Sequence, residues 1–411
     1  MRIAFIADWR SPHAYSWIRG IAGLGHECFV LATFPTNRIP PRRPVPVEVR
    51  EVPIALAGLQ RVWPKKQTSA ASTARKPKDA AHAVQARLLP VARVVLRHAA
   101  SFDLRRATGQ ANRLIAAFKP DLVHALRIPY EGIFATLLEP SAPLAVSVWG
   151  NDFTLFAARS QRLGRLTRAT MMQVDGLVAD CHADVSRAKE WGLADSCPTA
   201  VLPGGGGIDL AWLTGAPDRA KAKLALGIDP GATVVLEPRG DRGYVRIREY
   251  CAAIQDVARH RPDVVFLFAD MAGNPYVTDH LRRLGIKDRV VLLPKVSQDQ
   301  MATVFAAAEV SVSPSIHDGT PNSLLESMAA GCLPIAGDIP SVREWVTHGV
   351  NGLLCDPCSP AAITREILRG LTDQELVRAA ASHNRDLVHE RASRNTVMAA
   401  ADAYYQSLAA S

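Results

Sequence analysis

The sequence contains no run of about 18 uncharged apolar residues, the length that a membrane-spanning helix requires. Its first residues, MRIAFIADW, are too short a stretch for a secretory signal peptide and are interrupted by Asp8. The phosphate-binding pattern GxxxxGK(S/T) is absent, which argues against a P-loop nucleotide site. These absences predict a protein without a transmembrane helix, a signal peptide or a P-loop.

Cysteines are few and follow no framework. Seven are scattered through 411 residues, an odd number without the regular spacing of a disulfide-rich secreted domain. Cys355 and Cys358 form a Cys-x-x-Cys pair, but no second pair is present to complete a zinc site. The cysteine pattern therefore predicts a cytoplasmic protein in a reducing compartment.

Charge is distributed unevenly along the chain. Lys and Arg outnumber Asp and Glu by 48 to 39, and residues 38–106 alone hold fifteen basic and four acidic residues. This basic segment has few aromatic residues that could stack on bases, and it carries no zinc-finger or RNA-binding signature. A nucleic-acid partner is therefore not expected.

The basic segment divides into two parts. Residues 64–83 are low in sequence complexity, which predicts a flexible basic insert. Residues 83–102 place three arginines among leucines and valines, a pattern typical of an amphipathic helix. These arginines are Arg87, Arg93 and Arg97. Two interpretations remain open: residues 84–106 dock on an anionic membrane surface or an acidic acceptor, or the helix packs its apolar face on its own domain.

Short β-branched runs alternate with helical stretches along the chain. One series spans IAFIAD (3–8) to GLVAD (176–180), and a second spans TAVLPGG (199–205) to GLLC (352–355). Strands separated by helices predict right-handed βαβ crossovers and parallel sheets, with ligands at the carboxyl ends of the strands. The predicted fold class is α/β, with two Rossmann-like domains facing across a cleft. The expected divisions are an N-terminal domain at 1–195, a C-terminal domain at 196–385, and a helix at 386–411 that returns to the N-terminal domain.

The stretch HDGTPNSLLESMAAG at 317–331 holds two acids eight residues apart, Asp318 and Glu326. A helix that begins near Pro321 would have Pro in its first turn, where the missing N–H is tolerated. Asp318 would then face the positive helix N-terminus, a natural anion site, with Glu326 about a turn and a half further along. The acids could hold hydroxyl groups around a bound phosphate, or the helix could simply be capped with Glu326 solvated. The spacing alone favours the second interpretation.

Other notable residues follow predicted strands. Arg239 comes directly after the run VVLEP, with Arg242 and Arg246 close behind, and strand-end arginines can hold a diphosphate. Four glycines at 204–207 follow another run and let the backbone approach a ligand closely. Each feature is equally compatible with an ordinary basic or glycine-rich turn.

Over residues 292–357 the sequence resembles family 4 of the retaining glycosyltransferases, of group 1 type, whose fold is called GT-B. The resemblance rests on SPSIHDGTPNSLLESMAAGCLPIAGDIPSVREWVTHGVNGLLCDP, which holds an acid, seven residues, a glutamate, a small-residue turn, a Pro-led apolar strand and a closing Asn-Gly-Leu-Leu. It is moderate over 199–254 and looser in the first domain, and residues 38–115 are its main exception. The resemblance implies a nucleotide-sugar site between the domains, lined mainly by the second.

Carried over position by position, the resemblance implies donor-side roles. Asp318 would lie near the hydroxyls of the donor sugar, and Glu326 would pair with the ribose hydroxyls. Arg239 matches the diphosphate arginine, while the family's partner lysine is absent; Arg246 fits its place best, with Arg242 second. The remaining implied donor contacts are Gly207, Lys295, Val296, Gly319, Thr320, Pro321, Asn322 and Ser323.

The sequence departs from the family pattern in three places. The first acid is normally Glu, and Asp318 is one methylene shorter. The first-domain strand end normally carries His, whereas Trp149 stands here, so Asp152 or His13 is expected to supply the polar group on the acceptor side. The family's glycine-rich N-terminal loop is replaced by DWRSPHAYSW. These differences affect the acceptor contacts more than the donor contacts.

The resemblance implies a hexosyltransferase-like enzyme of class EC 2.4 that transfers a sugar to an acceptor hydroxyl with retention. Its implied catalytic residues are Asp318, Glu326, Arg239, Arg246 and Asp152. No Asp-x-Asp pair is present, so neither a metal nor another cofactor is expected. The expected acceptor is a glycan or a lipid-linked saccharide of cell-surface polysaccharide or glycolipid synthesis, met at the inner face of the membrane. Two alternatives remain open: an epimerase-type enzyme, and a non-catalytic protein that binds sugar nucleotides.

Overall fold

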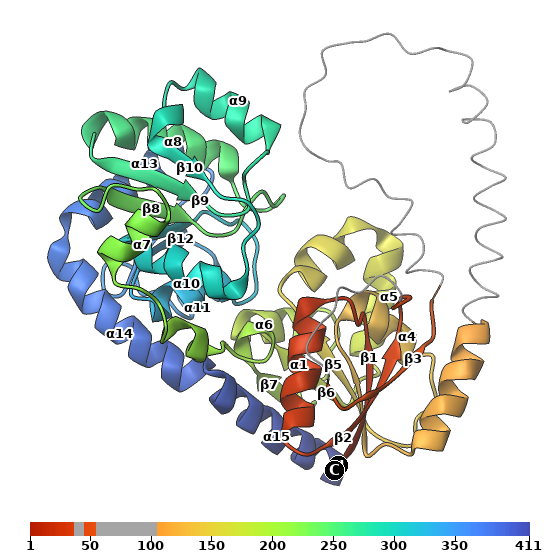
Figure 1. Ribbon diagram of the computed structural model, residues 1–411. Coiled ribbons are helices and arrows are strands. Elements are labelled where there is room, and N and C mark those ends of the chain that lie inside the picture. The colour runs from red at the N-terminus through yellow and green to blue at the C-terminus, as the bar shows by residue number, and fades with distance from the viewer. Residues whose placement is uncertain (37–44, 55–104) are drawn as a thin grey trace.

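The computed structural model describes residues 1–36, 45–54 and 105–411. The described chain forms two α/β domains, with α14 (Gln374–Ala392) along one and α15 (Arg394–Ala410) along the other (Figure 1). The predicted insert at 64–83 and the predicted helix at 83–102, with its three arginines, lie outside the described residues. None of the helices in the described ranges combines the length and the apolar character needed to span a bilayer.

The first domain is built on a seven-stranded parallel sheet in the order β3-β2-β1-β4-β5-β6-β7. Its inner strands are buried along their length and mostly apolar, as expected for a parallel sheet with both faces covered. The strands are β1 (Arg2–Ala7), β2 (Glu27–Ala32), β3 (Glu48–Glu51), β4 (Leu122–Ala125), β5 (Leu144–Val148), β6 (Gly176–Ala179) and β7 (Thr199–Val201). Its named helices are α1 (Pro12–Gly23), α4 (Ile133–Ala135), α5 (Gln161–Met171) and α6 (His182–Glu190).

Strand β7 differs from the assignment made from the sequence. The segment 199–205 is expected to begin the second series, but Thr199–Val201 pairs with β6 and forms the edge of the first sheet. Because β7 has only three residues, its local pattern does not specify which sheet it joins. The first sheet therefore continues beyond residue 195, and the chain crosses to the second domain after β7.

The second domain contains a six-stranded parallel sheet in the order β10-β9-β8-β11-β12-β13, so the prediction of two Rossmann-like α/β domains is confirmed. Its strands are β8 (Thr233–Glu237), β9 (Val264–Phe268), β10 (Val290–Leu292), β11 (Val310–Ser313), β12 (Leu333–Gly337) and β13 (Leu353–Cys355). Its helices are α7 (Arg219–Ala225), α8 (Ile247–His260), α9 (Pro275–Arg283), α10 (Gln298–Ala307), α11 (Asn322–Ala329), α12 (Pro340–Arg343) and α13 (Pro360–Thr372), followed by α14.

The chain passes between the domains twice, at Ile208 and again at Ser393, and backbone hydrogen bonds join the two crossing segments. The N–H of Ile208 donates to the Ala392 carbonyl at 2.7 Å, and the N–H of Arg394 donates to the Ile208 carbonyl at 2.9 Å. Ser393 lies between α14 and α15 and caps α15 with its side chain. From there α15 packs on the first domain, where its apolar residues share a core cluster with α1 and β1.

Tyr405 fixes α15 to the first sheet through a buried hydroxyl. This hydroxyl accepts a hydrogen bond from Trp17 Nε1 at 2.8 Å and bonds to His124 Nδ1. Tyr405→Phe should lower the free energy of unfolding by about 1–3 kcal/mol, because it leaves both ring nitrogens without this partner. Urea denaturation measures the loss. The control is Tyr404→Phe, which removes one hydrogen bond to the Pro198 carbonyl and should cost less; equal losses would contradict the prediction.

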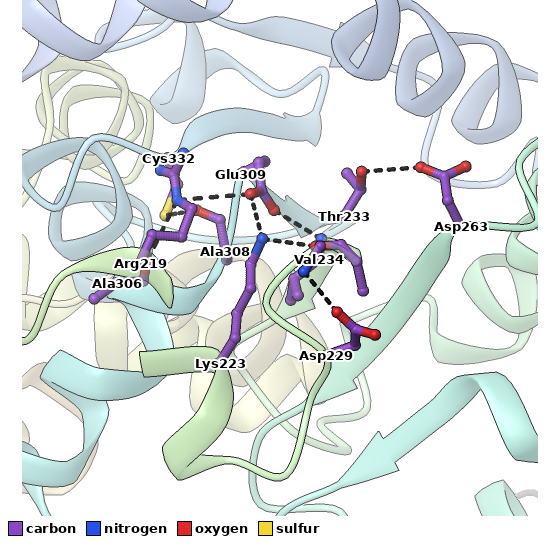
Figure 2. A network of polar contacts seen from close by, with 12 residues as sticks. Arg219, Lys223, Asp229, Thr233, Val234, Asp263, Ala306, Ala308, Glu309 and Cys332 are labelled. Atoms are coloured by element: carbon purple, nitrogen blue, oxygen red, sulfur yellow. Dashed lines mark hydrogen bonds and ion pairs between the residues drawn. The ribbon is translucent and has the colours of Figure 1, made fainter. Parts of the chain in front are cut away.

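A partly buried ion pair joins the amino ends of strands in the second sheet (Figure 2). Lys223 Nζ donates to Glu309 Oε1 at 2.7 Å and to the Ala232 carbonyl at 2.6 Å. The other carboxylate oxygen of Glu309 accepts from the N–H of Val234 in β8 at 2.7 Å. Because Glu309 directly precedes β11, this network stabilises the end of the sheet where the strands begin. Ligands bind in such folds at the other end, outside the carboxyl ends of the strands.

Candidate active site

A cleft between the domains follows the carboxyl ends of both sheets. Its main cavity has a volume of about 490 Å³, and an adjoining cavity of about 330 Å³ shares His13, Gly205, Asn322 and Glu326 with it. The first domain lines the main cavity with His13, Arg127, Trp149, Asn151, Asp180 and Gly205. The second domain lines it with Pro238, Arg239, Arg242, Tyr244, Met301, Asp318, Gly319, Thr320, Pro321, Asn322, Ser323 and Glu326.

The loop between β11 and α11 has the local structure that the sequence predicts. Pro321 is the N-cap residue of α11, which runs from Asn322 to Ala329, and Asp318 lies in the loop before it. The first-turn N–H groups of a helix have no intrahelical acceptor, and Asn322 and Ser323, which begin α11, line the main cavity. The positive end of α11 is therefore directed toward the space where an anion would bind.

Arg239 and Asp318 form a nearly buried ion pair in the wall of the main cavity. Arg239 Nη1 donates to Asp318 Oδ2, and Arg239 Nη2 donates to the Tyr244 hydroxyl at 3.1 Å. The Asp318 carbonyl accepts from Ser341 Oγ at 2.9 Å, which fixes the loop. The two residues that the resemblance implied on separate parts of the donor thus lie in contact.

Glu326 faces both cavities from the second turn of α11. Its side chain makes no hydrogen bond within the described residues, and burial raises its pKa to about 7. A carboxyl that titrates near neutral pH and faces a cavity is available to accept hydrogen bonds from ligand hydroxyls. Glu326 is therefore half-buried and lines the cleft, whereas the spacing alone favoured a solvated side chain.

The arginines after β8 are arranged differently from the sequence-based preference. Arg246, which fitted the family lysine best, pairs with Glu249 and does not line the cavity. Arg242 does line it, and the only hydrogen bond of its side chain within the described chain runs from Nε to the Arg239 carbonyl at 2.9 Å. An (i, i+3) acid on the same helix holds Arg246 away from the cleft, so Arg242 takes the position beside Arg239.

Three further predicted donor contacts lie away from the main cavity. Lys295 is exposed and Val296 is half-buried in the loop before α10, and neither lines either cavity. The following helix contributes Gln298 and Met301 to the cleft instead. Gly207 lines the adjoining cavity only. A Cβ at that position would lie 2.7 Å from Arg394 Cα, so this glycine also permits the two chain crossings to meet.

Asp152 does not reach the cleft, which corrects the expectation that it supplies a polar group there. It is fully buried, and its carboxylate accepts from Arg127 Nε at 2.9 Å and from the Trp149 N–H at 3.1 Å. A helical turn, Asp152–Phe156, begins at this residue and carries the side chain inward. Asp152 therefore positions Arg127, while His13 and Trp149, the other two acceptor-side predictions, do line the main cavity.

Two charged residues of the cavity wall were missed from the sequence. Arg127 follows β4 and Asp180 follows β6, and both therefore lie at strand carboxyl ends, where the general rule places ligand contacts. Burial raises the pKa of Asp180 well above its ordinary value, aided by the charges of Asp184 and Asp318. Strand-end position is the signal that could have identified both residues.

The two domains touch beside the cavity through backbone groups. Thr320 Oγ1 donates to the Asp180 carbonyl at 2.6 Å. The carboxylate of Glu344 accepts from the N–H groups of His182 and Ala183 at 2.9 Å each, at the positive end of α6. These contacts hold the loop that carries Asp318 against the first domain.

Within the described ranges, no group of three or more His, Cys, Asp or Glu side chains is arranged to hold a metal ion. Of the acids that line the cavity, Asp318 is paired with Arg239, and Glu326 makes no hydrogen bond within the described residues. The expectation that the site needs no metal stays a prediction.

Two family models match the chain. One, described as "Glycosyl transferases group 1", matches residues 234–386, and the other, "Glycosyl transferase 4-like", matches residues 71–179. The second match begins inside the segment 38–115 that the sequence resemblance left out. A D-inositol 3-phosphate glycosyltransferase of Segniliparus rotundus is 27% identical over 210 residues, which cover 50% of this chain and 46% of the relative. The same enzyme of Mycolicibacterium gilvum is 32% identical, covering 48% and 42%. The chain thus spans about half the length of the curated relatives it matches.

Solved structures match over the whole chain. Sucrose-phosphate synthase of Thermosynechococcus elongatus has a TM-score of 0.72 at 16% identity, with 100% of both chains covered. HepE of Anabaena, in complex with UDP and glucose, has a TM-score of 0.69 at 16% identity, covering 99% of this chain and 100% of HepE. These similarities confirm the predicted GT-B fold.

Proposed function

The chain belongs to the group 1 glycosyltransferases of family 4, and from this premise we propose that it transfers a sugar from a nucleoside diphosphate to an acceptor hydroxyl. The observation that carries the proposal is the meeting of Arg239, Asp318 and Glu326 around the N-terminus of α11 in one cleft. Guanidinium groups and helix N–H groups suit a diphosphate, while carboxylates suit sugar and ribose hydroxyls.

The proposed chemistry is transfer with retention. As the bond from the anomeric carbon to the diphosphate breaks, positive charge develops on the sugar and negative charge on the departing phosphate. Arg239, Arg242 and the N-terminus of α11 stabilise the phosphate charge, which replaces the role of a metal. The acceptor hydroxyl bonds to the anomeric carbon on the same face, and its proton passes to the departing phosphate oxygen.

We propose UDP as the nucleotide and a hexose as the transferred group. HepE, which shares this fold over its whole length, is described in complex with UDP and with UDP-glucose. The expected acceptor is a polyol or saccharide hydroxyl. An epimerase or a non-catalytic binding protein is not favoured by the family match.

A thermal-shift and turnover screen of UDP-, GDP- and ADP-sugars tests the proposal, with and without EDTA and with Glu326→Ala alongside. One donor should stabilise the wild type and release nucleoside diphosphate slowly, EDTA should change neither result, and the variant should lose the stabilisation. An epimerase would convert the donor without releasing nucleotide. A binding protein would show a thermal shift and no turnover, and absence of any shift would overturn the donor site.

Gly150 is predicted to permit closure of the cleft. A Cβ at this position would lie 2.0 Å from the Gly319 nitrogen in the opposite domain, and Gly150 has a φ of +52°. Gly150→Ala should hold the domains apart and lower donor turnover by about tenfold or more, because small displacements of catalytic groups are costly. Small-angle X-ray scattering should show a larger radius of gyration.

The matched control is Gly25→Ala. Gly25 also has a positive φ, +89°, but a Cβ there would meet nothing within 4 Å. Both variants therefore carry the backbone strain of alanine at positive φ, and only Gly150→Ala carries the clash. Equal turnover in the two variants would show that the Gly150 contact does not limit closure.

We also propose that residues 84–106 bind an anionic membrane surface near the acceptor. Their basic and apolar composition supports this, although they lie almost wholly outside the described residues. Replacing Arg87, Arg93 and Arg97 with glutamine should weaken the binding constant for phosphatidylserine vesicles, measured by sedimentation, by about a hundredfold, as each basic residue near such a surface contributes about 1 kcal/mol. Unchanged sedimentation would contradict the proposal.

A further inference from the structure

Arg127 is held on the first-domain wall of the cleft by two contacts that the proposed reaction does not use. Its Nε donates to the fully buried Asp152 at 2.9 Å, and its guanidinium lies over the Phe156 ring, with 4.6 Å from Cζ to the ring centroid. The other oxygen of Asp152 accepts from the Trp149 N–H. One edge and one face of the guanidinium are therefore occupied by the protein, and its orientation is fixed.

The terminal nitrogens of Arg127 remain available. They make no hydrogen bond within the part of the chain that the structure describes, and the residue lines the main cavity. The backbone of Arg127 has φ 115° and ψ 146°, a region that residues other than glycine rarely adopt. Such a conformation persists only where surrounding contacts enforce it, and here it accompanies the presentation of a charged group to the cleft.

The charges of the cavity leave Arg127 without a role at the diphosphate. Arg239 and Arg242 stand on the second domain beside the N-terminus of α11, where the diphosphate is proposed to bind. Arg127 stands on the other domain, beside Trp149, and these two residues also line a recess of about 50 Å³. The aromatic ring offers a face on which a sugar or polyol ring can pack. The fixed guanidinium beside it offers paired N–H donors to an acidic group attached to that sugar or polyol.

We propose that Arg127 binds a second anionic group, a carboxylate or phosphate carried by the sugar or polyol that contacts Trp149. This inference rests on the proposed function and names its substrate class. Arg presents parallel N–H donors that match both acids. The acid has two possible sources: the transferred sugar, as in a uronic acid donor, or the acceptor, as in a phosphorylated or carboxylated polyol.

The structure also contains an arginine–aspartate pair that serves as a matched control. Arg187 Nη1 donates to the fully buried Asp184 at 3.0 Å, and the arginine side chain is partly exposed, as in Arg127. Arg187 lines neither cavity of the cleft. If a buried aspartate simply requires an arginine for stability, the two arginines should behave alike on substitution.

Isothermal titration calorimetry on the full chain tests the inference in two arms. The donor arm compares UDP-glucuronate with UDP-glucose. The acceptor arm, at saturating UDP, compares inositol 1-phosphate with inositol and glucuronate with glucose. In at least one pair the acid should bind about tenfold or more tightly than its neutral counterpart, as expected for charge-assisted hydrogen bonds. The arm in which this preference appears identifies the source of the acid.

The preference should fall to less than about twofold in the double variant Arg127→Gln, Asp152→Asn, which removes both charges together so that no buried carboxylate is left unpaired. It should be partly kept in Arg127→Lys and fully kept in the matched double variant Arg187→Gln, Asp184→Asn. Unchanged UDP binding and melting temperature verify that each variant is folded.

Two results would overturn the inference, and only the second would also overturn the proposed function. If the wild type binds UDP but shows no acid preference in any pair, or if the preference survives in the double variant, the role of Arg127 is refuted and the proposed transferase function stands. If the wild type binds neither UDP nor a UDP-sugar, the proposed donor site fails and the inference fails with it.

Discussion

Arg239→Ala should lower the rate of nucleotide release from the donor by about a hundredfold or more, the loss typical of removing one preorganised group that stabilises transition-state charge. Arg239 is expected to have two roles: it stabilises the developing phosphate charge, and it holds Asp318 in place by an ion pair. Quenched single-turnover measurement of UDP formed from the donor identified by screening gives this rate without a contribution from product dissociation.

The variant also leaves Asp318 nearly buried without its partner, which is expected to destabilise the fold by roughly 3–5 kcal/mol. Adding Asp318→Asn should restore much of the stability and none of the rate, which separates folding from catalysis. Arg242→Ala should slow release more than Arg246→Ala, because Arg242 lines the cavity and Arg246 pairs with Glu249. A larger loss for Arg246→Ala would show that the guanidinium of Arg246 turns into the cleft when the donor binds.

The donor side of this site could be predicted from the sequence because its parts are close together in the chain. Asp318, Pro321 and Glu326 belong to one loop and one helix, so helix geometry alone sets their relative positions. Arg239 could be placed because it ends a strand with a clear apolar pattern. In each case the position of the side chain depends on local backbone structure.

The errors arose where a side chain's direction depends on distant contacts. Asp152 ends a strand as Asp180 does, but a helical turn carries Asp152 inward to Arg127, whereas Asp180 stays on the cavity wall. Arg246 and Arg242 are four residues apart, and only the neighbouring Glu249 decides which of them faces the cleft. Position after a strand contains no information on the direction of Asp152, whereas the (i, i+3) spacing of Arg246 and Glu249 is a signal that could have been read from the sequence.

Glu326→Gln should have opposite effects on stability and on donor binding. Burial raises the pKa of Glu326 to about 7, from an ordinary value of 4.5. The folded protein therefore holds this proton more tightly than the unfolded chain, and ionisation of Glu326 costs stability as the pH rises from about 4.5 through 7. Without a ligand, the variant should gain stability relative to the wild type between pH 5 and pH 8, by at most about 3 kcal/mol.

Donor binding should depend on pH in the opposite sense, because ribose hydroxyls donate to the carboxylate form. Wild-type affinity should rise as the pH passes through about 7, whereas the glutamine variant should bind about tenfold more weakly above pH 7 with little dependence on pH. Other carboxyls with raised pKa values, Glu131 and Glu237, are present in both proteins and cancel in the comparison. Parallel pH profiles in the two proteins would contradict the prediction, because they would mean that Glu326 does not titrate in this range.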